Sequence, residues 1–365
     1  MFNSAIQIQP GEQGEQGASA DRNRIINGQF DIWQRETSFS PLNDLYTADR
    51  WITVNQSSGF GAITWNVNRV SFSFGQILVP EQPEFYLNYQ GFTVGGTGNE
   101  AFNIHQRLEG SETLAGKTVT VSFYAMGNPN GTVHLNIAQG FENPAVGPEP
   151  PVEQQSVAIN LTNTFQRFVV QFNLPPVTGK VTSGVHSLRL RWWTQTGPNY
   201  AAIAPTVGPF INNGNPFTYS GVMSLANVQL EEGDIASQFE KKLPNDELIR
   251  CQRYYQKSYQ QGVFAGAGLP VSTERRGEIY IDSDSNFSGA FSHSFATSMR
   301  ASPTISVFSS AGVPNQAFDI IGQTVDLNLS GLGETGFSGG WFNQQPPSGS
   351  PLSYSYHYTA DAEII

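Results

Sequence analysis

Strict alternation of apolar and polar residues, repeated in short segments, is the feature that most restricts the fold of this 365-residue chain. Successive side chains of a β-strand point to opposite faces of its sheet. Each alternating segment therefore predicts an antiparallel strand with one buried face and one polar face. The segments are KTVTVSFYAMG (117–127), TVHLNIAQG (132–140), RFVVQFNL (167–174) and LRLRWWTQ (188–195).

The composition supports an all-β fold made of short strands and many turns. Only 13% of the residues are charged, whereas the chain holds 37 glycines and 22 prolines. Helical bundles need more Ala, Glu, Lys and Leu than this. Strands at this spacing, separated by Gly, Pro and Asn turns, predict a β-sandwich of the jelly-roll type. The net charge of −11 and the lack of a basic run argue against a nucleic-acid partner.

The N-terminal 22 residues cannot form a core. Glycines 11, 14 and 17 recur with the collagen period, but three triplets are too few for a triple helix. We expect an extended peptide, which is either an attachment to a larger assembly or a tail. After it, Asn27 and Gly28 predict a turn that leads into a first strand with Phe30 and Trp33.

One segment, 243–259, has helical rather than strand periodicity. Asn245 is its expected N-cap, and Asp246 and Glu247 suit the positive end of the helix dipole. Cys251, the single cysteine of the chain, is expected to be buried as an apolar side chain.

These segments predict the domain organisation. An extended peptide (1–22) precedes a jelly roll (23–242), a connector helix (243–260) and a smaller β-domain (261–365). The last domain is expected to bury the ladder of Tyr354, Tyr356 and Tyr358, which share one face with Leu352 and Ala360. No stretch reaches the roughly 18 apolar residues that span a bilayer, and no secretory signal is evident.

The polar faces of the predicted strands carry the candidate site. On 188–195, the alternation places Trp192 in the core and leaves Trp193 as the exposed aromatic. Flat aromatic rings with Arg, Asn and Gln side chains are suited to sugars. The alternative is that this face packs against the C-terminal domain or another subunit. The candidate glycan-binding residues are Trp193, Arg189, Arg191, Tyr124, His134, Asn136 and Gln171.

Catalytic motifs do not emerge from the sequence. The five histidines lack metal-ligand spacing, and no nucleophile elbow or phosphate-binding loop is present. A pair of catalytic carboxylates is defined in space, so the sequence selects none. We expect a protein that binds rather than catalyses.

Several short motifs, in a fixed order, resemble a module of bacteriophage tail-fibre and other virion structural proteins. They are NGQFDIWQR (27–35), YTADRW (46–51), NVQLEEGDIASQFEKK (227–242) and DELIRCQRYYQKS (246–258). These modules are similar to jelly-roll carbohydrate-binding modules. The resemblance implies a non-enzymatic, trimeric virion protein, assembled in the bacterial host cytoplasm, whose residues 1–22 contact other virion proteins.

The resemblance also raises the question of a structural calcium. The carbohydrate-binding modules place acidic residues in their last strand, but Asn227 stands at that position here. Asp31 remains the candidate calcium ligand, with a turn or cap as the favoured alternative role.

Our leading hypothesis is a tail fibre or receptor-binding protein that attaches the virion to host surface glycans through many weak sites. The first alternative is an architectural virion protein, such as a head fibre, capsid decoration or tail adaptor. The second, from another class, is a polysaccharide depolymerase.

Overall fold

The computed structural model describes 13 segments of the chain. They are residues 6–7, 21–40, 44–56, 64–92, 101–143, 147–149, 154–179, 186–198, 215–268, 275–281, 287–319, 324–344 and 353–364. Within them the chain forms two compact units. The first comprises Met1–Asp31, Thr37–Lys242 and Ile364, and the second is built from Ile32–Glu36 and Leu243–Glu363.

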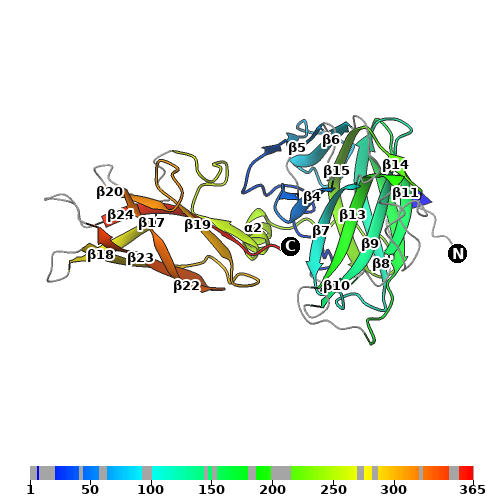
Figure 1. Ribbon diagram of the computed structural model, residues 1–365. Coiled ribbons are helices and arrows are strands. Elements are labelled where there is room, and N and C mark those ends of the chain that lie inside the picture. Colours follow the sequence, from blue (N-terminus) through cyan, green and yellow to red (C-terminus); the bar gives the residue numbers. More distant parts are fainter. Residues whose placement is uncertain are drawn as a thin grey trace. The chain divides into compact units, whose positions relative to one another are not determined.

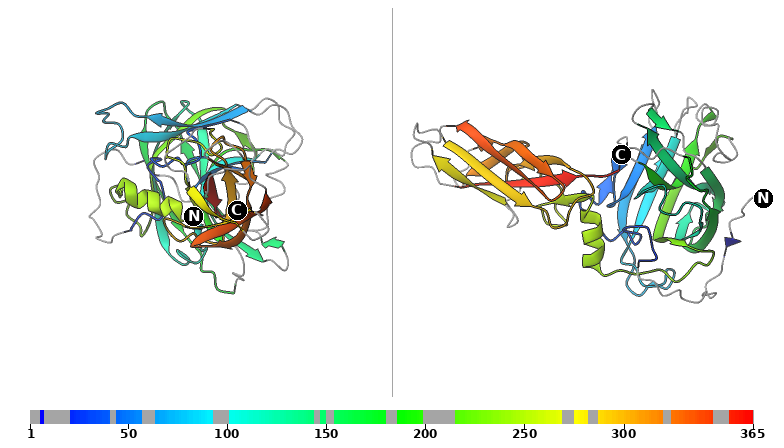
Figure 2. Two further views of the ribbon diagram at one scale, coloured as in Figure 1. Left: turned by 90° about the vertical axis from the view of Figure 1, so that its left-hand side faces the viewer. Right: turned by 90° about the horizontal axis from the view of Figure 1, so that it is seen from below.

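The first unit is a sandwich of two antiparallel sheets, as the alternation predicts (Figure 1; Figure 2). In the β8 sheet the strand order is β1 (Ile6–Gln7), β12 (Gln166–Asn173), β8 (Thr118–Gly127), β15 (Gly221–Glu232), β6 (Phe85–Phe92), β5 (Thr64–Ser71) and β2 (Ser38–Phe39).

The second sheet of the sandwich, the β13 sheet, carries the candidate site. Its strand order is β10 (Gly147–Glu149), β9 (Thr132–Asn143), β13 (Ser187–Thr196), β7 (Ala101–Glu109), β4 (Trp51–Gln56) and β3 (Leu45–Tyr46). Two further strands pair with it: β11 (Gln154–Asn160) with β9, and β14 (Phe217–Thr218) with β13.

Aromatic side chains fill the space between the two sheets. The ring of Phe123 on β8 meets the ring of Trp192 on β13 edge to face, with centroids 5.3 Å apart. Trp192 also lies 5.7 Å from Trp51 of β4. All three side chains are buried, so the prediction that Trp192 belongs to the core is confirmed.

The segment after the predicted Asn27–Gly28 turn differs from expectation. The amide of Phe30 donates to the carbonyl of Asn27, and Phe30 and Trp33 are buried, but residues 29–33 form no strand. A Cβ atom on Gly28 would lie 2.2 Å from the carbonyl oxygen of Val228. The turn therefore packs closely on β15 at Gly28, and the amide of Val228 donates to the Gly28 carbonyl.

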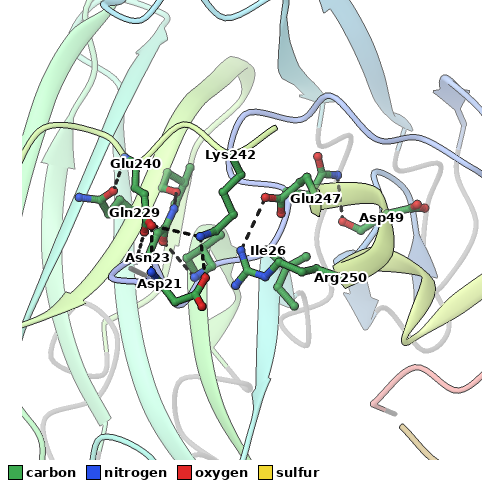
Figure 3. Close-up of polar contacts among 12 residues, drawn as sticks. Asp21, Asn23, Ile26, Asp49, Gln229, Glu240, Lys242, Glu247 and Arg250 are labelled. Atoms are coloured by element: carbon green, nitrogen blue, oxygen red, sulfur yellow. Dashed lines mark hydrogen bonds and ion pairs between the residues drawn. The ribbon is translucent and has the colours of Figure 1, made fainter. Parts of the chain in front are cut away.

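A cluster of polar contacts connects residues 21–23, at the beginning of the sandwich, with residues 240–242, at its end (Figure 3). The carboxylate of Glu240 accepts the backbone amides of Asp21 and Asn23, at 3.0 and 2.7 Å. The ammonium of Lys242 contacts Asp21 and Glu240 at 2.8 and 3.1 Å. The amide of Glu240 in turn donates to Gln229 on β15. The contacts with Asp21 and Asn23 join residues more than 200 positions apart and close the unit.

The predicted helix exists but is shorter than expected. α2 spans Pro244–Gln252. Its N-cap is Leu243, without a side-chain cap, rather than Asn245, because Pro244 occupies the first helical position. Asp246 and Glu247 lie in the first turn, and Cys251 is buried, as predicted.

The helix ends early because the following residues join a sheet. In the second unit, the strand order is β21 (Thr324–Asp326), β20 (Gln316–Asp319), β24 (Ser353–Asp361), β17 (Arg275–Ile281), β18 (Phe287–Ser294), β23 (Gly336–Gln344) and β22 (Asn328–Gly333). Both β16 (Tyr255–Lys257) and β19 (Thr304–Phe308) pair with β24 as well.

The tyrosine ladder forms part of the core of the second unit. Tyr356, Tyr358 and Ala360 are buried together with Phe291 and Phe337, as predicted. The side chains of Tyr354 and Leu352 lie outside the described residues. In the described segments, no helix has the length and apolar character needed to cross a membrane.

Candidate functional site

The candidate site is the outer face of the β13 sheet, meaning the face turned away from the sandwich core. Trp192, Leu190, Ile104 and Leu135 point inward and are fully buried, so the residues that alternate with them point outward. The outer face is formed by Asn103, His105 and Arg107 of β7, Arg189, Arg191 and Trp193 of β13, and His134 and Asn136 of β9.

The strand register arranges these residues in rows across the sheet. Trp193 lies opposite Asn103 on one side and His134 on the other. In the next row, Arg191 lies opposite His105 and Asn136. Cross-strand neighbours on one face lie about 4.5–5.5 Å apart at Cβ, so each row forms a continuous surface.

A chain of hydrogen bonds runs along β7. The Nδ1 atom of His105 lies 2.7 Å from Oδ1 of Asn103, and Nε of Arg107 donates to Nε2 of His105 at 3.1 Å. Because Nε2 accepts, Nδ1 carries the proton and donates to Asn103. Burial lowers the pKa of His105 well below its ordinary value, and the nearby charges of Arg107, Arg191 and Arg189 lower it further. The imidazole is therefore neutral at neutral pH.

Arg191 and Trp193 form the centre of the outer face. Arg191 donates from Nε to Oδ1 of Asn136 at 2.9 Å, and its guanidinium lies 5.4 Å from the centroid of the Trp193 ring. The expected exposure of Trp193 is wrong, since only 2% of it is accessible. Phe217 of β14 and Ala101 of β7 pack against it. Because β14 pairs with the end of β13, it brings an aromatic side chain over the sheet.

His134 lies at the end of the outer face nearest to β14. Its ring lies 4.4 Å from the ring of Phe217, at an interplanar angle of 51°. Burial lowers the pKa of His134 to about 4, so this side chain is also neutral at neutral pH. It presents one N–H donor and one nitrogen acceptor.

The other end of the outer face contacts the chain's own residue Ile364. The carbonyl of Ile364 accepts hydrogen bonds from Nη1 of Arg107 at 3.0 Å and from the hydroxyl of Tyr46 at 2.8 Å. Ile364 is itself only 1% exposed. Part of the outer face therefore packs against a residue of the same unit.

Two residues of the predicted set lie elsewhere. Tyr124 and Gln171 belong to β8 and β12, so the structure places them on the other sheet. Tyr124 packs with Val79, Phe165 and Ala226, and Gln171 donates to the backbone carbonyl of Asp234. The alternation predicted correctly that both side chains point away from the core of the sandwich. It does not predict which of the two sheets a strand joins.

Asn227, which stands at the expected acidic position, makes hydrogen bonds with its side-chain amide. The side-chain amide of Asn227 donates to the carbonyl of Pro80 and to Glu81, and its oxygen accepts from Gln29. Among the described residues, Asp31 included, no group of three or more His, Cys, Asp or Glu side chains could hold a metal ion.

Three residues of the outer face were missed from the sequence. Asn103, His105 and Arg107 alternate with the buried side chains of Phe102, Ile104 and Leu108 in AFNIHQRLE (101–109). The same period-two pattern that located β13 was available here.

No protein-family model matches the sequence, and no curated protein matches it. The solved structures to which the chain is similar include the enzymatically active domain of bacteriophage CBA120 tailspike protein 4, at 14% identity over 58% of this chain, with a TM-score of 0.34. The similar region spans 22% of the length of that tailspike chain.

Two further similar structures are sugar-related. They are a Family 11 Carbohydrate-Binding Module of a Clostridium thermocellum cellulase (12% identity, 53% of this chain and 93% of that chain, TM-score 0.31) and a putative sugar binding protein from Bacteroides thetaiotaomicron (12% identity, 58% and 100%, TM-score 0.31).

Proposed function

We propose that this chain is a carbohydrate-binding β-sandwich protein of a bacteriophage virion, which attaches the particle to glycans of the host surface. It acts by binding, without catalysis, and many weak sites on a homotrimer supply avidity. The order of the motifs between 27 and 258 supports the virion assignment, and the outer face of the β13 sheet supports the binding role.

The observation that carries the proposal is the composition of the rows on the outer face. Planar side chains dominate them: one indole, two neutral imidazoles, two amides and three guanidinium groups lie on three adjacent strands. Planar donors and acceptors on a rigid sheet suit the fixed hydroxyl directions of a pyranose. Since β-strands hold these groups, little conformational entropy is lost when a glycan binds.

A ligand has two ways to reach these residues. Arg107 and Arg189 are partly exposed, so a glycan can contact their edge of the face directly. Arg191 and Asn136 are buried, and contact with them requires movement of the covering residues.

A second function has one specific observation in its favour. The contacts of Ile364 with Arg107 and Tyr46 use part of the outer face for intramolecular packing. A face used in this way fits a purely architectural virion protein, in which Arg and aromatic side chains hold chain segments together.

Binding of the full-length chain to a glycan array and to host cells tests the proposal. Arg189→Ala removes a partly exposed guanidinium of the outer face, whereas Gln171→Ala is the matched control on the other sheet. We expect binding by the unmodified chain, a loss of about tenfold in affinity for Arg189→Ala, and no change for Gln171→Ala. Equal effects of the two variants contradict the assignment of the face.

Immunogold labelling of virions separates the two functions. A receptor-binding role predicts labelling at the tail tip together with glycan binding. Labelling of the capsid without glycan binding favours the architectural alternative.

A further inference from the structure

We propose that the cavity between the β8–β9 turn and β14 binds a terminal sugar residue of an uncharged glycan. This inference rests on the proposed carbohydrate-binding function and names the ligand class of one subsite. The cavity has a volume of about 600 Å³, within the ~300–1,000 Å³ range of small-molecule sites. Its lining comprises residues 128–132, His134 and residues 217–220.

The cavity adjoins the outer face through His134. This residue lines the cavity and lies opposite Trp193 in the sheet register. A sugar in the cavity therefore lies at the edge of the outer face, beside the Phe217 ring that covers Trp193. Polar groups are accessible at this end of the outer face, because Asn130, Thr218 and Ser220 are exposed.

The wall of the cavity is held rigidly by its own contacts. The hydroxyl of Tyr219 accepts the backbone amide of Asn128 at 2.9 Å and donates to the carbonyl of Val222. The side-chain oxygen of Asn128 accepts the amide of Val222 at 3.1 Å. A Cβ atom on Gly131 would lie 2.1 Å from the Tyr219 ring, so the turn packs directly on that ring. A preformed wall reduces the entropy lost on binding.

The lining combines an aromatic surface with uncharged hydrogen-bonding groups. Phe217 is partly exposed, and its ring can contact the C–H face of a pyranose. The amide of Asn130 and the hydroxyls of Thr218 and Ser220 supply donors and acceptors. This mixture matches a sugar, which has hydroxyls at its rim and apolar C–H bonds on its faces.

The charge of the lining decides the ligand class. Among the described residues that line the cavity, none is Asp, Glu, Lys or Arg. The low pKa of His134 keeps its ring uncharged at neutral pH. A carboxylate or sulfate in the cavity would lose hydration without gaining a cation from these residues. Neutral hexoses and their N-acetylated forms fit, and uronic or sialic acids do not.

Saturation-transfer NMR of the full-length chain with single sugars tests the inference. The probes are glucose, galactose, mannose and N-acetylglucosamine, against glucuronic, galacturonic and N-acetylneuraminic acids. We expect transfer to at least one neutral sugar and none to the acidic sugars. Stronger transfer to an acidic sugar overturns the ligand class.

Two variants probe the cavity with little risk to the fold. Asn130 has a φ of +63°, so Asn130→Gly removes the amide side chain at a position where glycine is unstrained. Thr218→Val removes an exposed hydroxyl at nearly constant volume. We expect the double variant to weaken neutral-sugar binding by about tenfold or more, while Gln171→Ala, on the other sheet, leaves single-sugar binding unchanged.

The outcomes separate this inference from the proposed function. If the double variant binds every sugar and glycan as the unmodified chain does, while Arg189→Ala weakens glycan binding, the cavity assignment is wrong and the proposed function stands. If the unmodified chain binds no sugar and no glycan, both are overturned.

Discussion

The rings of His134 and Phe217 lie 4.4 Å apart, at the point where β14 covers the end of the β13 sheet. This contact joins a strand of the sandwich to a short strand more than 80 residues later. His134 is buried, and its burial lowers its pKa to about 4. The same short strand buries Trp193.

The first prediction concerns the pH dependence of stability. An unfolded chain protonates His134 near pH 6.5, whereas the folded chain does so only near pH 4. The contribution of neutral His134 to the free energy of unfolding is therefore fully present above pH 6.5. As the pH falls toward 4, on the order of 2–3 kcal/mol of this stability is lost. Urea unfolding at pH 7 and pH 5 should show a smaller pH effect for His134→Asn than for the unmodified chain. An identical pH effect would show that His134 is not buried as a neutral ring.

The second prediction follows from the burial of Trp193. Trp193→Ala should destabilise the sandwich by about 3–5 kcal/mol, as expected for a large buried aromatic. Phe74→Ala is the control, because Phe74 is 108% exposed and its removal should change stability by less than about 0.5 kcal/mol. The free energy of unfolding in urea measures both. A near-neutral Trp193→Ala would restore the sequence-based expectation of an exposed indole.

The third prediction concerns the cluster of Asp21, Glu240 and Lys242 (Figure 3). Burial raises the pKa of Glu240, but the amide of Asn23 and the contacts with Lys242 outweigh it, so the pKa lies below its ordinary value. The stabilisation that ionised Glu240 gives the fold is therefore fully present above the pKa of this carboxyl in the unfolded chain. It is lost as the pH falls through the lower pKa that the carboxyl has in the folded chain. Glu240→Gln should cost about 1–2 kcal/mol at pH 7.

The matched control for Glu240 is Glu232, whose ion pair with Lys117 is largely exposed. Glu232→Gln should cost less than about 1 kcal/mol, since exposed pairs are screened by water and salt. Comparable losses for the two variants would mean that the cluster does not close the sandwich.

The fourth prediction concerns the segment at Ile364, a residue of the first unit. Removing both donors to the Ile364 carbonyl, with Tyr46→Phe and Arg107→Gln together, should raise the hydrogen-exchange rate of this segment. Tyr46→Phe alone keeps the Arg107 contact and should have a smaller effect. Unchanged exchange in the double variant would show that other contacts hold the segment.

The β-sandwich could be predicted from the sequence because its long strands show the alternation of apolar and polar residues that is typical of a β-strand. The alternation in 117–127 and 188–195 located β8 and β13 and placed Trp192 in the core. It could not predict the burial of Trp193, because the residue that covers it, Phe217, lies outside any alternating segment. Alternation specifies two faces of a strand, and solvent exposure depends on what else packs there.

Only part of the candidate site could be predicted from the sequence, because the site also depends on the order of the strands. His134, Asn136, Arg189, Arg191 and Trp193 meet because β9 and β13 are neighbours. Tyr124 and Gln171 lie on the other sheet because strand order is set by long-range pairing, which local periodicity does not contain. The helix was shorter than its pattern, since Tyr255 pairs with β24, a strand from the end of the chain.

The measurement that tests the central claim most directly is a crystal structure of the full-length chain with an oligosaccharide selected from the glycan array. We predict sugar density on the outer face of the β13 sheet, in contact with Arg189 or within the His134–Phe217 cavity. Sugar bound instead on the β8 sheet near Tyr124 and Gln171, or no glycan bound by any form of the chain, would contradict the account.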